Sequence, residues 1–109
     1  MTGRLPAQLE VGGLIRAAQN AGGFASVLHK GDSEAGTILL IVTERGTNPR
    51  LFERMPSADG TREWSQRIIQ NIEIKEQFEE YLARRRAQDP DLWIVELDSA
   101  NGERLIGLS

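Results

Sequence analysis

Acidic side chains occur in two short polar segments of the chain. The stretch 31–36 carries Asp32 and Glu34, and the stretch 89–91 carries Asp89 and Asp91. Magnesium and calcium ions take several oxygen ligands at short range, so these four carboxylates are the candidate metal ligands. Arginines beside such an ion would suit a phosphate-bearing substrate. The sequence therefore allows one enzymatic hypothesis, a small divalent-metal-dependent enzyme that acts on a phosphate-bearing substrate.

Three consecutive arginines, Arg84, Arg85 and Arg86, end a predicted helix. They complement the negative end of the helix dipole, and they are also candidate contacts for a phosphate group or for RNA. His29, the one histidine, is a further candidate ligand contact, although a histidine in an apolar strand is more often packed. Trp64 is expected to be a core residue of a strand, and the alternative is that it is partly exposed and anchors a partner protein.

Ordinary turn chemistry accounts for the same carboxylates without a ligand. Aspartate favours loops because its side chain accepts hydrogen bonds from nearby backbone N–H groups, and Pro90 ends a helix without help from a metal. The chain lacks the glycine-rich nucleotide loops, the zincin motif and the nucleophile elbow, and its single histidine makes a serine triad a poor fit. No catalytic residue is assigned, and no cofactor is expected outside the metal hypothesis.

Hydrophobic periodicity and turn residues predict the elements of the fold. A helix is expected from about Leu9 to Ala18, and a second from about 74 to 88, where apolar residues mark one face. The expected strands are 24–30, 37–44, 50–54, 63–70 and 92–97, with a short final strand near 104–106. The predicted connections are a hairpin turn at 46–49, a loop at 55–61, and a type I′ turn at Asn101-Gly102.

These elements define an α+β fold with a mainly antiparallel sheet of about five strands and two flanking helices. The core of the second strand, 38–42, is apolar throughout, which implies that helices cover both faces of the sheet. A meander through the first four strands would bring the loops 31–36, 55–61 and 89–91 to one end of the sheet. The acidic residues of these loops would then share one rim with His29 and the three arginines: Asp32, Glu34, Asp59, Asp89, Asp91, Arg84, Arg85 and Arg86.

Composition narrows the class of protein. The 109 residues suit one domain, residues 1–109, and the absence of cysteine excludes disulfides and thiolate metal sites. The net charge of −3 argues against binding to nucleic acid or to an anionic membrane surface. No segment is long and apolar enough to be a signal peptide or to span a bilayer, which favours a cytoplasmic protein.

Three segments resemble one family of small proteins: 14–17, the loop 31–36, and 81–93, which reads YLARRRAQDPDLW. The chain is similar over nearly its whole length to the bacterial domain of unknown function 1491 family. That resemblance implies a stand-alone domain. It implies no activity and no catalytic residue.

The working hypothesis from the sequence is a non-enzymatic binding or protein-interaction module with an unknown protein partner. The metal-dependent enzyme is the alternative, and RNA binding through Arg84–Arg86 is the weaker alternative. The oligomeric state and the order of strands in the sheet stay open.

Overall fold

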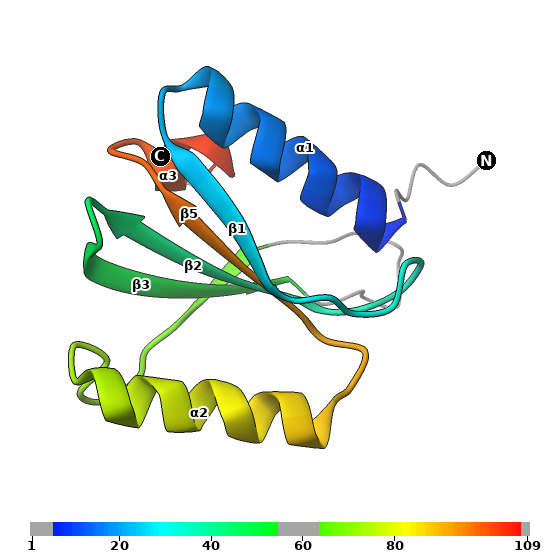
Figure 1. Cartoon of the computed structure of the whole chain (residues 1–109), viewed down its shortest axis with the longest axis vertical. Coiled ribbons are helices and arrows are strands. Elements are labelled where there is room, and N and C mark those ends of the chain that lie inside the picture. Colours follow the sequence, from blue (N-terminus) through cyan, green and yellow to red (C-terminus); the bar gives the residue numbers. More distant parts are fainter. Residues whose placement is uncertain (1–5, 55–63, 108–109) are drawn as a thin grey trace.

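The computed structural model describes residues 6–54 and 64–107, which form one five-stranded sheet with helices against both of its faces (Figure 1). In chain order the elements are α1 (Ala7–Asn20), β1 (Phe24–His29), β2 (Ile38–Glu44), β3 (Thr47–Arg54), β4 (Trp64–Arg67), α2 (Lys75–Gln88), β5 (Trp93–Asp98) and α3 (Gly102–Leu105). The predicted α+β class is confirmed, with three helices in place of two. The predicted loop at 55–61, with Asp59, lies outside the described residues.

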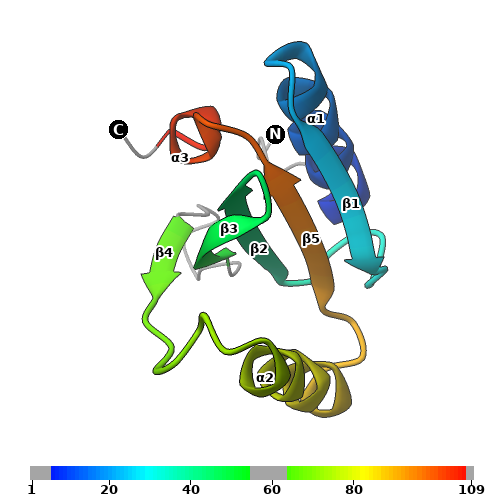
Figure 2. The same ribbon diagram turned by 60° about the vertical axis from the view of Figure 1, so that its left-hand side comes forward.

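The strands lie in the order β1-β5-β2-β3-β4, so the sheet is not a meander (Figure 2). The last strand in the chain, β5, lies between β1 and β2, antiparallel to β1 and parallel to β2. The remaining pairs, β2 with β3 and β3 with β4, are antiparallel. The sheet is therefore mixed and mainly antiparallel. β1 and β4 are its two edges.

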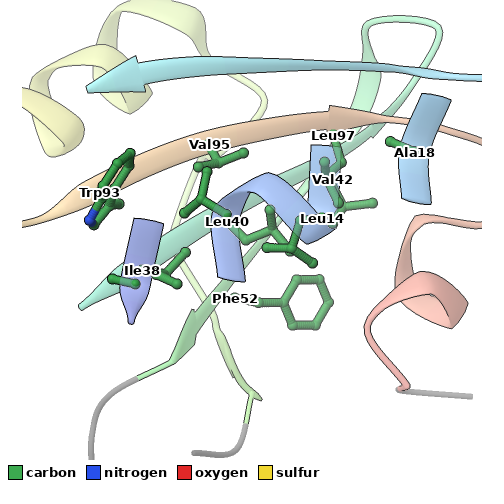
Figure 3. Packing of buried hydrophobic residues seen from close by; sticks show 11 residues of the cluster. Leu14, Ala18, Ile38, Leu40, Val42, Phe52, Trp93, Val95 and Leu97 are labelled. Atoms are coloured by element: carbon green, nitrogen blue, oxygen red, sulfur yellow. The ribbon is translucent and has the colours of Figure 1, made fainter. Parts of the chain in front are cut away.

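The larger hydrophobic core lies between α1 and the sheet (Figure 3). Alternate residues of β2 and β5 point toward α1, and they meet the apolar face that α1 was predicted to have. The core is completed by Phe52 of β3 and by Trp93 of β5, which is 3% exposed. The buried members are Ala7, Val11, Leu14, Ala18, Ile38, Leu40, Val42, Phe52, Trp93, Val95 and Leu97.

A smaller core lies on the opposite face, beneath α2. Its buried members are Leu39, Ile41, Leu51, Leu92 and Ile94. Phe78, Tyr81 and Leu82 of α2 pack on it, yet none of the residues in α2 is fully buried. Apolar packing therefore covers this face less completely than α1 covers the other.

The β2–β3 turn lies two residues earlier than predicted. Its centre is Arg45-Gly46, and both residues have positive φ (53° and 75°), as a type I′ turn requires. The carboxylate of Asp98, at the end of β5, accepts hydrogen bonds from both backbone N–H groups, at 2.7 Å from Arg45 and 2.8 Å from Gly46. The turn is thus fixed to the neighbouring strand, which compensates for the unusual backbone of Arg45.

The predicted final strand near 104–106 is wrong, because this segment forms the short helix α3. β1 and β2 already occupy both edges of β5, so no edge beside it is free for another strand. Asn101 has φ −120°, which also rules out the predicted I′ turn. Gly102 lies against Val42 so closely that a Cβ would be 2.3 Å from its Cγ1, and α3 thereby closes one end of the larger core.

Within residues 6–54 and 64–107, the structure contains no helix both long and apolar enough to cross a membrane.

Candidate functional site

The two acidic segments do meet at one end of the sheet. The Asp32 N–H donates to the Asp91 carbonyl oxygen at 3.0 Å, and His29 Nδ1 lies 2.6 Å from the Leu92 carbonyl oxygen. The strand order that brings the two segments together differs from the predicted meander, since β5 lies beside β1. Because β1 is antiparallel to β5, the end of β1 still lies beside the start of β5. His29 is half-buried between these strands, and its Nδ1 is engaged with the backbone.

The carboxylates themselves bond to the backbone around them. Asp32 Oδ2 accepts hydrogen bonds from the N–H groups of Ala35 (2.8 Å) and Glu34 (3.0 Å), and these bonds hold the pKa of Asp32 below its ordinary value. Asp89 Oδ1 accepts a bond from the Asp91 N–H at 3.1 Å. The side chains of Glu34 and Asp91 are exposed. Two of the four predicted ligands therefore serve as turn acceptors.

In the part of the chain that the structure describes, no group of three or more histidine, aspartate or glutamate side chains could hold a metal ion. The structure thus gives the metal hypothesis no supporting geometry, and it stays a prediction.

The 31–36 loop has a structural role that joins three elements. Its carbonyl groups cap α1, since the N–H groups of Ala7 and Gln8 donate to the Glu34 and Ser33 oxygens at 2.9 and 3.0 Å. Trp93 Nε1 donates to the Asp32 carbonyl at 2.7 Å. Gly36 packs so tightly that a Cβ would lie 2.3 Å from the Asp91 carbonyl oxygen. This loop ties the first helix to the start of β5.

The three arginines at the end of α2 do not behave alike. Arg84 and Arg86 are exposed, whereas Arg85 turns toward the sheet and its Nη1 donates to Glu53 Oε1 at 2.9 Å and to the Tyr81 hydroxyl at 2.9 Å. Arg67 Nε of β4 donates to the same Glu53 oxygen at 3.2 Å. Arg85 is therefore a link between α2 and the sheet.

Glu53 is a buried charge that sequence reasoning missed. Its side chain is 4% exposed, on the face of β3 that α2 covers. Burial raises the pKa of Glu53, but the hydrogen bonds and positive charges of Arg85 and Arg67 outweigh that effect and hold the pKa below its ordinary value. The sequence did contain a signal for this burial: Glu53 lies two residues after the core residue Leu51, and alternate residues of a strand face the same side of a sheet. The two arginines that neutralise it lie 14 and 32 residues away.

Trp64, the predicted partner anchor, is half-buried and packs against the larger core. The Arg54 guanidinium lies over its ring, 5.4 Å from the centroid, and also pairs with Glu10 of α1 at 2.5 Å. This arrangement favours the structural interpretation of Trp64.

A different surface stands out: the outer edge of β1. Phe24 is 75% exposed, Leu28 47% and Val27 41%. Ala25 packs on the α1 side, so its neighbours Phe24 and Ser26 face the α2 side by strand alternation. This edge carries apolar side chains and, among the described residues, pairs with no further strand.

The hydrogen bonds of β5 show which backbone groups of β1 point outward. Trp93 and Ser99 donate to Thr37 and Thr43 on the β2 side, at 2.9 and 3.0 Å. Successive residues of a strand bond to opposite neighbours, so the even-numbered residues of β5 bond to β1. Their partners in the register are Phe24 and Ser26. The N–H and C=O groups of Ala25 and Val27 therefore point away from the sheet.

Beside this edge lies an open groove of about 670 Å³ between α2 and the sheet. Leu28 of β1 forms one side, Phe78 and Leu82 of α2 another, and Ile41 part of the floor. Glu73, Glu79 and Glu96 line it with a single basic side chain, Lys75. The groove is thus apolar in its interior and acidic overall.

The geometry defines an α+β domain with a mixed five-stranded sheet and one open apolar edge. The chain belongs to the family described as "Protein of unknown function (DUF1491)", whose model matches residues 5–107, so the resemblance seen in the sequence is confirmed. The curated proteins contain no match.

Solved structures of similar proteins show the same fold. A crystal structure of a DUF1491 family protein from Caulobacter crescentus is 34% identical, covers 94% of this chain and 95% of its own, and has a TM-score of 0.77. A solution structure of a protein from A. tumefaciens is 30% identical over 96% and 94% of the two chains, with a TM-score of 0.79. An NMR structure of a Caulobacter crescentus family protein is 33% identical over 98% and 94%, with a TM-score of 0.75.

Proposed function

We propose that this chain is a non-enzymatic protein-interaction module that binds an extended segment of a partner protein along the outer edge of β1. The observation that carries the proposal is the combination of outward-pointing backbone groups at Ala25 and Val27 with exposed apolar side chains on the same strand. An added strand would pair with those groups, and the apolar side chains would provide contact area.

The other edge of the sheet is a poorer docking strand. Natural proteins protect edge strands by keeping them short or by placing charges and prolines on them. β4 has four residues and ends in Arg67, which is ion-paired with Glu53. β1 has six residues, and none of them is proline, lysine, arginine, aspartate or glutamate. β1 therefore lacks charges and prolines, and its β-bulge between Val27 and His29 leaves 24–27 as the regular stretch of the edge.

A partner segment suits this edge better than a second copy of the chain. Two β1 strands paired about a twofold axis would bring two acidic grooves to the same side of a joined sheet. Like charges brought together in this way repel each other, whereas a segment without acidic residues avoids the repulsion.

The absence of cysteine agrees with a reducing compartment, and we propose that the module acts in the cytoplasm. The metal-dependent enzyme and RNA binding through the arginines stay predictions. Of the three arginines, Arg84 and Arg86 alone are exposed.

Selection of peptides from a random twelve-residue display library against the full chain tests the proposal. Val27→Pro is the decisive variant, because it removes an N–H that points outward and leaves the β1–β5 ladder intact. Val27→Thr is the matched control, since it retains the N–H and the branched shape. We expect selected peptides to bind Val27→Thr nearly as well as the wild type and to bind Val27→Pro at least tenfold more weakly.

The circular dichroism spectrum establishes that both variants are folded, and Ala25→Pro repeats the test if Val27→Pro is not. Peptides that bind all variants equally, or a library that yields no binder, would contradict the proposal. A dimer of the wild type at micromolar concentration, converted to a monomer by Val27→Pro, would assign the edge to a second copy instead.

A further inference from the structure

Three side chains of β1 face the same side of the sheet, and the middle one is small whereas the two outer ones are apolar. Phe24 and Ser26 occupy alternate positions on the side of the sheet that α2 covers, and Leu28, at the β-bulge between Val27 and His29, lines the groove on the same side. Phe24 and Leu28 are exposed by 75% and 47%, and Ser26 is also exposed. An added strand would place three of its own side chains opposite these residues.

Directly behind Ser26 lies a carboxylate. Glu96 of β5 is the register partner of Ser26, and it lines the groove between α2 and the sheet. Across the described part of the chain, its side chain has a single hydrogen bond, a long one of 3.5 Å from the Thr43 hydroxyl. Glu96 is half-buried, so a cation that reached it would be partly shielded from water.

The surroundings of Glu96 favour a positive charge. Glu73, in the turn before α2, and Glu79 of α2 line the same groove, against one basic residue, Lys75. Asp98, the next residue on this face of β5, is already bonded to the β2–β3 turn. The apolar walls of Leu28 and Phe78 would accommodate the methylene stem of a long basic side chain.

Resting on the proposed function, we infer that the partner segment carries a lysine or arginine between two apolar residues at alternate positions, and that Glu96 receives its charge. The two apolar residues lie opposite Phe24 and Leu28. The pattern apolar-x-basic-x-apolar is symmetric, so it fits a segment of either direction.

The distances permit this contact. An added strand would lie two strand spacings from β5, roughly 10 Å. A lysine or arginine side chain and a glutamate side chain span that separation between them when the intervening side chain is small. Ser26 supplies the small side chain, and a larger residue there would block the path.

Three blocked heptapeptides test the inference, with valine at positions two and six, threonine or serine elsewhere, and lysine, methionine or glutamate at position four. Binding to the full chain is measured by NMR titration. We expect the lysine peptide to bind about two- to fivefold more tightly than the methionine peptide, which is the upper range of a partly exposed ion pair, and the glutamate peptide to bind most weakly. Glu96→Gln should remove the lysine preference, whereas Glu76→Gln, on the exposed surface of α2, should leave it intact.

The preference should also shrink between 50 and 500 mM sodium chloride. Equal binding of the lysine and methionine peptides, lost in Val27→Pro, would overturn the inference and leave the proposed function standing. Lack of binding by all three peptides overturns the inference as well, and the library selection then judges the proposed function separately. A lysine preference that persists in Glu96→Gln would also refute the role of Glu96.

Discussion

The ion pair between Arg85 and Glu53 joins α2 to the sheet beside the apolar contacts of the smaller core, and it gives a quantitative prediction. None of the residues in α2 is fully buried, so the bond from Arg85 to Glu53 carries a large share of the attachment. Arg85→Met removes the guanidinium and keeps an apolar stem. Glu53, 4% exposed, would then have one ion pair left, at 3.2 Å to Arg67.

Removing one partner of a buried ion pair costs about 3 to 5 kcal/mol. We expect a loss near the lower end, about 3 kcal/mol in the free energy of unfolding, because Arg67 still neutralises part of the charge. Arg67→Met should cost about 1 kcal/mol, since its side chain is 49% exposed and Glu53 keeps Arg85. In a chain of this length, these losses correspond to falls in Tm of about 12 °C and 4 °C.

Urea unfolding followed by tryptophan fluorescence measures both losses. The double variant Glu53→Gln/Arg85→Met should recover part of the loss, because a neutral amide needs no counter-charge. Equal effects of Arg85→Met and Arg67→Met, or a loss below 1 kcal/mol for Arg85→Met, would refute the reasoning.

The remaining predictions concern pH, packing and metal. Folding lowers the pKa of Glu53, so the stabilisation by its carboxylate is present above pH 4.5, the ordinary pKa, and is lost as the pH falls through the pKa of the folded state. The free energy of unfolding should therefore fall more steeply with acid in the wild type than in Glu53→Gln. Parallel curves for the two proteins would contradict this. Gly36→Ala should lower Tm by several degrees, because its Cβ would lie 2.3 Å from the Asp91 oxygen, whereas Gly22→Ala serves as a control for backbone strain without a clash. Thermal unfolding with 5 mM magnesium or calcium should leave Tm unchanged, because Asp32 and Asp89 already accept backbone bonds; a rise that grows with metal concentration would revive the metal site.

Local patterns in the sequence identified most of the elements. The apolar spacing of α1 and α2, and the apolar run of β2, can be read within each segment, without knowledge of which distant residues that segment packs on. The end of α2 at the segment 89–91 follows from Pro90, whose ring disfavours helical geometry in the preceding residue. Each of these patterns lies within a single segment of the chain, and the structure has α1, α2 and β2 where the patterns predict them.

The strand order stayed open in the sequence analysis, although a signal for it existed. β5 is apolar on both faces except at Glu96 and at its last residue, Asp98, and β2 is apolar throughout 38–42, which indicates two interior strands. A meander leaves β5 beside β4 or at an edge, and this position conflicts with that composition. A position of β5 between β1 and β2 agrees with that composition. It also leaves neither edge of β5 free to pair with the segment near 104–106. The final segment therefore became α3.

The site was harder to predict than the fold, because it depends on what the sheet leaves uncovered. The meeting of Asp32 with the 89–91 segment was expected, but the bonds to backbone N–H groups that occupy Asp32 and Asp89 depend on loop conformation. The edge position of β1 follows from the insertion of β5, and so does the placement of Glu96 behind Ser26. Neither could be derived while the order of strands was open.

Amide hydrogen exchange of β1 tests the central claim most directly. In the free chain, the amides of Ala25 and Val27 should exchange quickly, whereas those of Phe24 and Ser26 are protected by β5. With a library-selected peptide bound at saturation, we predict that exchange slows at Ala25 and Val27. Protection that appears instead on β4 or α3, with Ala25 and Val27 exchanging as in the free chain, would contradict strand addition at this edge.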